Sequence, residues 1–151
     1  MSRHAFRLSR RHRFALYGAL GLSFASGLSW WLLDHFGRIE GEFGALPHPA
    51  QAWLLRIHGA AAFASLIVLG TLLPVHVKRA WRAAKNRRSG AVMVGLVSLQ
   101  VGTGYALYYA DEGLRTLAGQ IHFALGITLP VLLAVHIVIG RRITARRPRS
   151  F

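Results

Sequence analysis

The sequence predicts an all-α fold, an integral membrane four-helix transmembrane bundle whose N- and C-termini are both cytoplasmic. Hydrophobic residues make up 53% of the 151 residues. They gather in four segments, each long enough to cross about 30 Å of hydrocarbon at 1.5 Å per residue. We expect a single transmembrane domain over residues 1–151, with basic cytoplasmic tails at 1–13 and 141–151 and spans at about 14–33, 52–77, 91–110 and 117–139.

Charge is divided between the two ends of the predicted spans. The net charge is +14, yet all five acidic residues lie in loops 34–51 and 111–116. Of the 19 Lys and Arg residues, only Arg38, Arg56 and Arg115 lie at that end, which we call the outer end. Four spans place both termini and the middle loop on one side, so the positive-inside rule makes the basic, inner end cytoplasmic. Basic residues that flank spans are expected to contact anionic membrane lipid, and we predict no nucleic-acid partner.

The first half of the chain contains two predicted helices and a longer loop. Helix 14–33 has a face of Gly and Ser suited to close packing and no histidine in its interior. It lacks a small-x-small cleavage site at its end, so we interpret it as a retained helix rather than a signal peptide. Loop 34–51 is rich in Gly and Pro and is expected to form turns rather than a folded domain. Pro74 should kink helix 52–77 near its inner end.

The second half contains the other two predicted helices. Helix 91–110 has Gly95 and Gly102 seven residues apart, which indicates a second close-packing face. The outer connection 111–116 is short. Helix 117–139 contains Pro130, where a kink is expected, and a disordered basic tail should follow it.

Two of the predicted spans each carry two histidines. His58 and His76 lie 18 residues apart in one, and His122 and His136 lie 14 residues apart in the other. At 100° per residue, the first pair returns to the same helix face and the second misses it by about 40°. Imidazole in hydrocarbon is costly unless something binds it. The pattern therefore indicates axial ligands for two haem irons, one near each end of the bundle.

Depth decides how the histidines pair. Both spans run from the outer to the inner end, so His58 is expected to pair with His122, and His76 with His136. A mismatch remains, because 18 residues rise about 27 Å and 14 residues rise about 21 Å. Proline kinks and helix tilt would absorb it. The alternative is that one site is ligated differently, with His35 or His48 of the outer loop involved.

Other interpretations of these residues stay open. A histidine in a transmembrane helix often only packs and forms a hydrogen bond, and zinc or copper would need three or four converging ligands. The absence of cysteine excludes disulfides, iron–sulfur clusters and thioether-linked haem held by this chain. The predicted cofactor is therefore haem b, two per chain, held by coordination and packing. His4 and His12 lie in the predicted basic tail and are interpreted as solvated.

Two outer cations complete the predicted haem-binding set. Arg56 and Arg115 lie where the propionates of an outer haem would emerge, and charged donors suit carboxylates. Ordinary anchoring at the membrane interface is the alternative role for both.

Several motifs resemble those of small four-helix membrane dihaem cytochrome b proteins. They are His58, Leu73-Pro74-Val75-His76, Ser89-Gly90, Thr103-Gly104-Tyr105-Ala106-Leu107-Tyr108-Tyr109, His122 and His136. The 14-residue histidine spacing is similar to that of the cytochrome b subunits of membrane-bound formate dehydrogenases and hydrogenases. The resemblance implies haem b, a bacterial inner-membrane location, and electron transfer between a periplasmic partner and the quinone pool. Those larger subunits take one ligand from helix 1, where this chain has none in the span interior.

The function that we predict is transmembrane electron transfer through two b-type haems. A periplasmic cytochrome or dehydrogenase subunit would exchange electrons with the outer haem, and the quinone pool or a membrane partner with the inner one. The chain would then be an electron-transfer subunit of a hetero-oligomeric complex, with quinone as a further candidate ligand. The alternatives are a quinone oxidoreductase in its own right, a structural or assembly subunit of a larger redox complex, and a transporter, which no broken helix pair supports.

Overall fold

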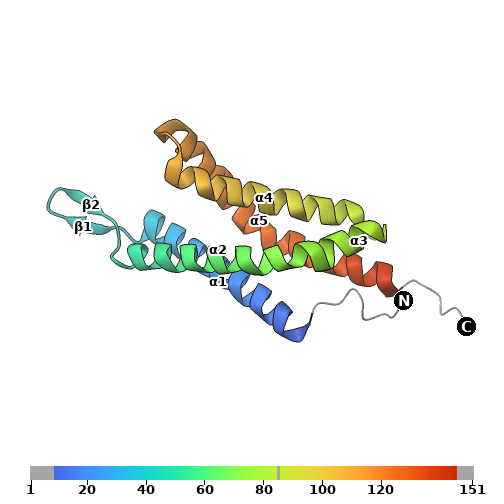
Figure 1. Ribbon diagram of the computed structural model, residues 1–151. Coiled ribbons are helices and arrows are strands. Elements are labelled where there is room, and N and C mark those ends of the chain that lie inside the picture. Colours follow the sequence, from blue (N-terminus) through green and yellow to red (C-terminus); the bar gives the residue numbers. More distant parts are fainter. Residues whose placement is uncertain (1–8, 85, 146–151) are drawn as a thin grey trace, which may run out of the picture. The chain divides into compact units, whose positions relative to one another are not determined.

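The chain folds into long helices that are apolar enough to cross a membrane. The computed structural model describes residues 9–84 and 86–145, and within these residues four helices have the necessary length and hydropathy. They are α1 (Arg10–Phe36), α2 (Ala50–Leu72), α4 (Arg87–Tyr109) and α5 (Glu112–Ala145), as Figure 1 shows. The predicted all-α membrane fold is confirmed. Each predicted span overlaps one of these helices.

The helices form two compact units, Met1–His76 and Val77–Phe151. In the first unit α1 packs against α2, and in the second α4 packs against α5. Each unit is thus a pair of consecutive helices joined at its outer end. Most of the large apolar side chains on these helices are exposed, which suits surfaces that face lipid or other helices. The few buried residues among those described include Ser26, Ser65 and Thr103.

Both tails are shorter than the sequence predicted, because the helices extend into them. Helix α1 begins at Arg10, where the side chain of Ser9 caps it by accepting a hydrogen bond of 3.2 Å from the backbone N–H of His12. Helix α5 continues to Ala145, so residues 141–145 are helical rather than part of a disordered tail. The remaining residues of both predicted tails, and Lys85, lie outside the described part of the chain.

The outer connections differ in length. Loop residues Ile39–Gly41 (β1) and Gly44–Leu46 (β2) form an antiparallel hairpin whose turn ends at Gly44, a residue with a φ of +116°. This hairpin projects beyond the ends of α1 and α2 (Figure 1). The expectation of turns was therefore incomplete, because these residues also form a ladder. The other connection is tight, as predicted: the Asp111 carboxylate accepts a hydrogen bond of 2.9 Å from the backbone N–H of Leu114 and begins α5.

Pro74 changes the helix geometry, as a proline inside a helix is expected to do. Leu73–Val77 form a π-helical turn, η2, between α2 and the short helix α3 (Lys78–Arg82). Proline has no N–H to donate to the carbonyl four residues earlier, and π-turns arise where that ladder is broken. In α5, by contrast, the helix runs through Pro130 without a change of helix type.

Candidate functional site

His58 lies on α2 and faces α1. Its Nδ1 is 2.8 Å from the carbonyl oxygen of Ser23 and 3.4 Å from the hydroxyl oxygen of Ser26. A carbonyl oxygen can only accept, so Nδ1 of His58 carries the proton and donates it. The ring also lies against Gly27, where a Cβ atom would come within 3.0 Å of Cε1 and Nδ1. The neighbouring helix therefore fixes both the tautomer and the plane of this ring.

His122 is held in the same way within the second unit. It lies on α5 and faces α4, with its Nδ1 3.1 Å from the hydroxyl oxygen of Thr103. That hydroxyl donates its own proton to the carbonyl of Leu99 at 2.9 Å, so it accepts from Nδ1 of His122. Nε2 of His122 therefore carries the lone pair. This atom accepts a hydrogen bond of 3.2 Å from the side-chain amide nitrogen of Gln100. A Cβ at Gly104 would lie 3.2 Å from the ring.

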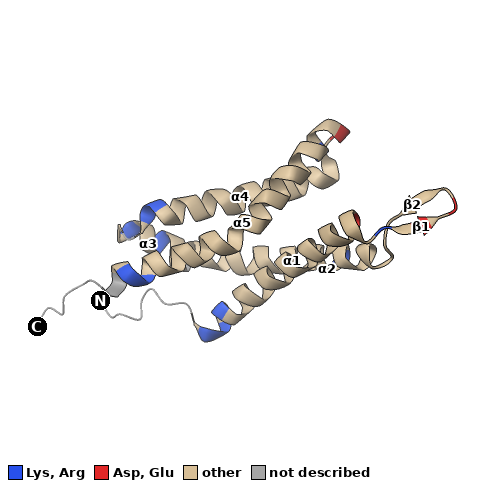
Figure 2. Ribbon diagram, turned by 180° about the vertical axis from the view of Figure 1, so that it is seen from behind, with Lys and Arg blue, Asp and Glu red and all other residues tan. Residues whose placement is uncertain are grey.

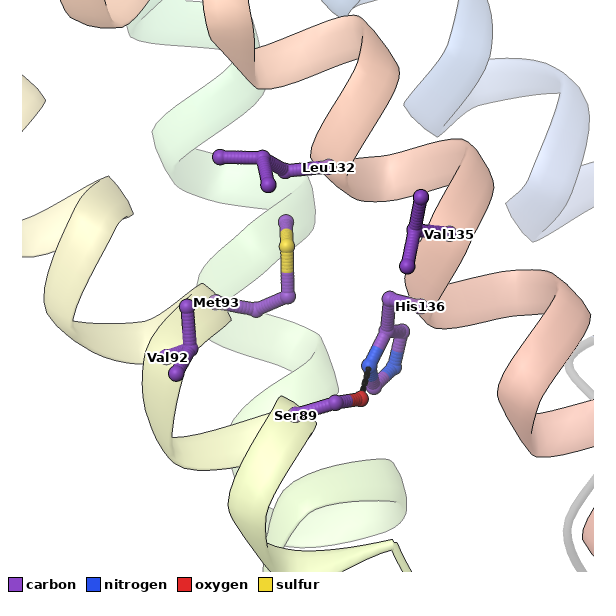
Figure 3. Close-up of a pocket in the computed structure, with 6 residues that line it drawn as sticks. All are labelled: Ser89, Val92, Met93, Leu132, Val135 and His136. Atoms are coloured by element: carbon purple, nitrogen blue, oxygen red, sulfur yellow. Dashed lines mark hydrogen bonds between the residues drawn. The ribbon is translucent and has the colours of Figure 1, made fainter.

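His136 lines a small apolar pocket near the inner end of the second unit. Its Nδ1 is 2.7 Å from the hydroxyl oxygen of Ser89 (Figure 3). The pocket has a volume of about 100 Å³, and its other lining residues are apolar side chains from α4 and α5. They are Val92, Met93, Leu132 and Val135. The hydroxyl of Ser89 orients the imidazole as the hydrogen-bond partner of a metal-ligating histidine does, and the side chains beside it are apolar.

His76 lies inside the π-helical turn η2 and is half-buried. The prediction that His58 and His76 share one helix face assumed 100° per residue over the whole interval. A π-turn holds about one residue more than an α-turn, which changes the bearing of the residues beyond it by about 100°. The shared face is therefore supported only up to Leu72, where α2 ends.

His12 is predicted from the sequence to be solvated, and its contacts in the structure correct that prediction. It lies in the first turn of α1, is half-buried, and has its Nε2 2.8 Å from the hydroxyl oxygen of Thr71 on α2. The Thr71 hydroxyl donates to the carbonyl of Val68, so it accepts from His12. Ser9, three residues earlier, is the sequence signal that could have placed this histidine on the helix.

The other residues named from the sequence make local contacts at the outer end. The guanidinium of Arg56 lies over the ring of Trp53 at 4.8 Å, and Arg115 donates to the carbonyl of Ala110 at 3.0 Å. Both arginines are exposed. Nδ1 of His35 lies 3.0 Å from the Trp31 carbonyl, and Nδ1 of His48 accepts from the backbone N–H of Ala50 at 3.1 Å.

The two units therefore contain histidines of the kind that haem ligation needs. In His58 and His122, Nδ1 is the donor to an oxygen of the neighbouring helix, which makes Nε2 the nitrogen with the lone pair. Metal-bound histidines commonly have this arrangement, since an acceptor at the second nitrogen orients the ring and raises its basicity. The residues present thus fit a haem iron.

Comparison with known proteins gives one match. The family model of the prokaryotic cytochrome b561 family matches residues 71–148, about half of the chain. This region contains His76, His122 and His136. No curated protein and no solved structure matches the chain.

Proposed function

We propose that this chain, which belongs to the prokaryotic cytochrome b561 family, carries electrons between an outer and an inner haem. The family membership makes the chain a multi-pass bacterial membrane protein that binds haem b and transfers electrons across the membrane. It confirms the predicted likeness to small membrane cytochromes b. The likeness to the subunits of formate dehydrogenases and hydrogenases stays a prediction, as do the number of haems and the partners.

The outer haem is proposed to take one imidazole from each unit, His58 from the first and His122 from the second. The observation that carries this proposal is the matched state of the two rings. Each donates Nδ1–H to an oxygen of the adjacent helix, and each lies against a glycine of that helix. Both side chains are thus oriented for ligation through Nε2 by contacts within their own unit, and for His122 this ligation requires the amide of Gln100 to leave its contact with Nε2.

The inner haem is proposed to take His136 from the second unit and one imidazole from the first. His76 is the ligand that pairing by depth predicted. His12 is a second candidate, because its contact with Thr71 fixes its level along α2. Thr71 is 13 residues from His58, a rise of about 20 Å, which is close to the rise of about 21 Å between His122 and His136. His76 lies 18 residues after His58, a rise of about 27 Å in an α-helix, which exceeds the rise between His122 and His136 by about 6 Å unless the π-turn shortens it.

Electrons are proposed to enter or leave through an acidic outer end and a basic inner end. Within each unit the acidic residues lie at one end, and most of the described Lys and Arg residues lie at the other (Figure 2). The positive-inside rule then makes both termini cytoplasmic and directs the β1–β2 hairpin to the periplasm of a bacterial inner membrane. A periplasmic cytochrome or dehydrogenase subunit would dock on the outer end, and quinone or a membrane partner would react near the inner end. The chain is then one component of a hetero-oligomeric complex.

The protein's contribution is ligation, orientation and exclusion of water. When bound, haem b supplies a one-electron iron couple in the hydrocarbon region. The imidazoles would hold the iron, and the oxygen acceptors on α1 and α4 would keep the rings of His58 and His122 in place. Arg56 and Arg115 are proposed to serve the propionates of the outer haem, which requires each guanidinium to leave its present contact. The apolar wall beside His136 keeps water from the inner site.

Electron transfer across vesicles tests this function. Purified protein in sealed proteoliposomes, with ferricyanide trapped inside and an impermeant reductant outside, should reduce the trapped oxidant, and His122→Ala should stop this. His35→Ala should leave the transfer unchanged, since His35 is exposed and makes local contacts; loss of transfer in this variant would instead support the alternative ligation by the outer loop. Wild-type vesicles that hold haem but transfer no electrons would instead support a structural or assembly subunit.

A further inference from the structure

Two hydroxyl–glycine pairs, on different helices, hold two of the histidines in the same manner. Ser26-Gly27 of α1 contacts His58 within the first unit, and Thr103-Gly104 of α4 contacts His122 within the second. In both cases the pair lies on the first long helix of its unit and the histidine on the second long helix. The repetition in two separate units indicates a common role.

The hydroxyl of each pair is already a donor to its own helix. Ser26 donates to the carbonyl of Leu22 at 2.6 Å, and Thr103 donates to that of Leu99 at 2.9 Å, four residues earlier in each case. A hydroxyl has a single proton, so each oxygen faces its imidazole with lone pairs only. The two residues are 4% and 7% exposed, so water does not compete for them. Each pair therefore selects the Nδ1–H tautomer of the histidine that it contacts.

The glycine of each pair sets the distance of the ring. A Cβ at Gly27 would come within 3.0 Å of the ring of His58, and one at Gly104 within 3.2 Å of the ring of His122. Any other residue would push the imidazole away from the helix that holds it. The hydroxyl fixes the tautomer, and the glycine lets the ring approach.

The two hydroxyl–glycine pairs differ in whether the histidine Nδ1–H has a second acceptor besides the hydroxyl. Nδ1 of His58 has a second acceptor, the backbone carbonyl of Ser23 at 2.8 Å, which is closer than the hydroxyl of Ser26 at 3.4 Å. For Nδ1 of His122 the acceptor is the hydroxyl of Thr103 at 3.1 Å. A side-chain substitution can therefore remove the hydroxyl acceptor of His122 but not the carbonyl acceptor of His58.

We propose that the hydroxyl–glycine pairs are positioning residues that set the reduction potential of the outer haem, with Thr103 as the controlling side chain. This inference rests on the proposed function, in which His58 and His122 ligate that haem. An acceptor at Nδ1 makes an imidazole a stronger electron donor, which stabilises the ferric iron and lowers the potential. Removal of the Thr103 hydroxyl should weaken this donation and raise the potential.

The test is a spectroelectrochemical titration of Thr103→Val in the full-length protein. Valine keeps the branched shape and loses the hydroxyl. A hydrogen bond that is stronger in the ferric than in the ferrous state by about 1 kcal/mol corresponds, when it is lost, to an approximately fivefold rise in the reduced-to-oxidised ratio at a fixed applied potential. At 59 mV per tenfold for one electron, this is an upward shift of about 40 mV in one haem, with the other unchanged. Thr103→Ser should restore the wild-type value.

The controls separate positioning from packing. Ser26→Ala should shift the potential less than Thr103→Val, because the Ser23 carbonyl remains; equal shifts would overturn the special role of Thr103. Gly104→Ala should lower the occupancy of the outer haem, whereas Gly95→Ala, where a Cβ meets no atom within 4 Å, should not. If Thr103→Val does not retain haem, Thr103→Ala is titrated instead.

Two outcomes distinguish a failure of this inference from a failure of the proposed function on which it rests. A haem-loaded wild type with no shift in Thr103→Val or Thr103→Ala overturns the role of the hydroxyl–glycine pairs and leaves the proposed function intact. A wild type without haem overturns both.

Discussion

Nε2 of His12 on α1 lies 2.8 Å from the hydroxyl oxygen of Thr71 on α2. This contact places a histidine of the first helix at the level of Thr71, which lies 13 residues after His58 on α2 and five residues before His76, the candidate ligand that the sequence predicts. The first unit therefore contains two candidate imidazoles for the proposed inner site. A ligand from helix 1 is also what the resemblance to larger cytochrome b subunits implied and what the sequence had not found within the span.

Single substitutions separate these two candidates. Because the proposed inner site takes His136 and one imidazole of the first unit, either His12→Ala or His76→Ala should remove the inner haem, and the other substitution should keep both haems. Low-temperature optical spectra of the reduced proteins report the loss of one of two α-bands. If both variants kept both bands, the inner ligand would be neither residue, and His136 would pair differently.

The helix α5 histidines should control the two haems independently. His122→Ala should remove the outer haem and leave the inner one, and His136→Ala should do the reverse, because each iron takes one ligand from this helix. Haem content and far-ultraviolet circular dichroism of the purified variants check this. Helical content should not change, because the helices pack through small residues and apolar contacts. Loss of both haems from an inserted, helical variant would contradict the pairing by depth.

The outer hairpin should steer the periplasmic partner. Glu40 lies on β1, Glu42 lies in the turn, and the neighbouring Phe43 is 95% exposed at the tip. Reversal of both charges, in Glu40→Lys with Glu42→Lys, should slow electron exchange with a basic partner at low salt and reverse its dependence on ionic strength, because the net charge of the outer end changes sign and steering acts on the association rate. Stopped-flow kinetics at several salt concentrations measure this.

The matched control for the hairpin is Glu112→Lys, a charge reversal in the other outer connection. It should change the rate less than the hairpin variant does. Equal effects, or unchanged rates with the native partner, would move the docking surface away from the hairpin.

The membrane fold could be predicted from hydropathy and charge, since a span needs about 20 apolar residues whatever it packs against. The helix ends were less predictable. Ser9 caps α1 but lies in a run of basic residues whose composition indicates a solvated tail. The composition therefore predicts that His12 is solvated, although it lies in the first turn of α1. Pro74 was expected to disturb its helix. The sequence does not show which carbonyls accept the backbone hydrogen bonds beyond the proline, and so it predicts neither the π-turn nor the direction in which His76 points from the helix axis.

The chemistry of the candidate site could be predicted only in outline. The number and spacing of the histidines indicated haem, because four imidazoles in apolar segments need binding partners, and a haem iron is one. The hydroxyl–glycine pairs were beyond sequence reasoning: Thr103-Gly104 appeared as a motif, and Ser26 and Gly27 as part of a small-residue face. Their role depends on how the neighbouring helices are rotated, which brings the hydroxyl of Thr103 within 3.1 Å of His122.

The most direct test of the account is the number of haems per chain. Pyridine haemochrome quantitation of the purified protein, referred to its polypeptide concentration, should give two non-covalent b-type haems. A value near one would contradict the inner site and leave the outer pair of His58 and His122. A value near zero in correctly inserted protein would contradict the central claim, that paired histidines of the two units carry electrons across the membrane through haem.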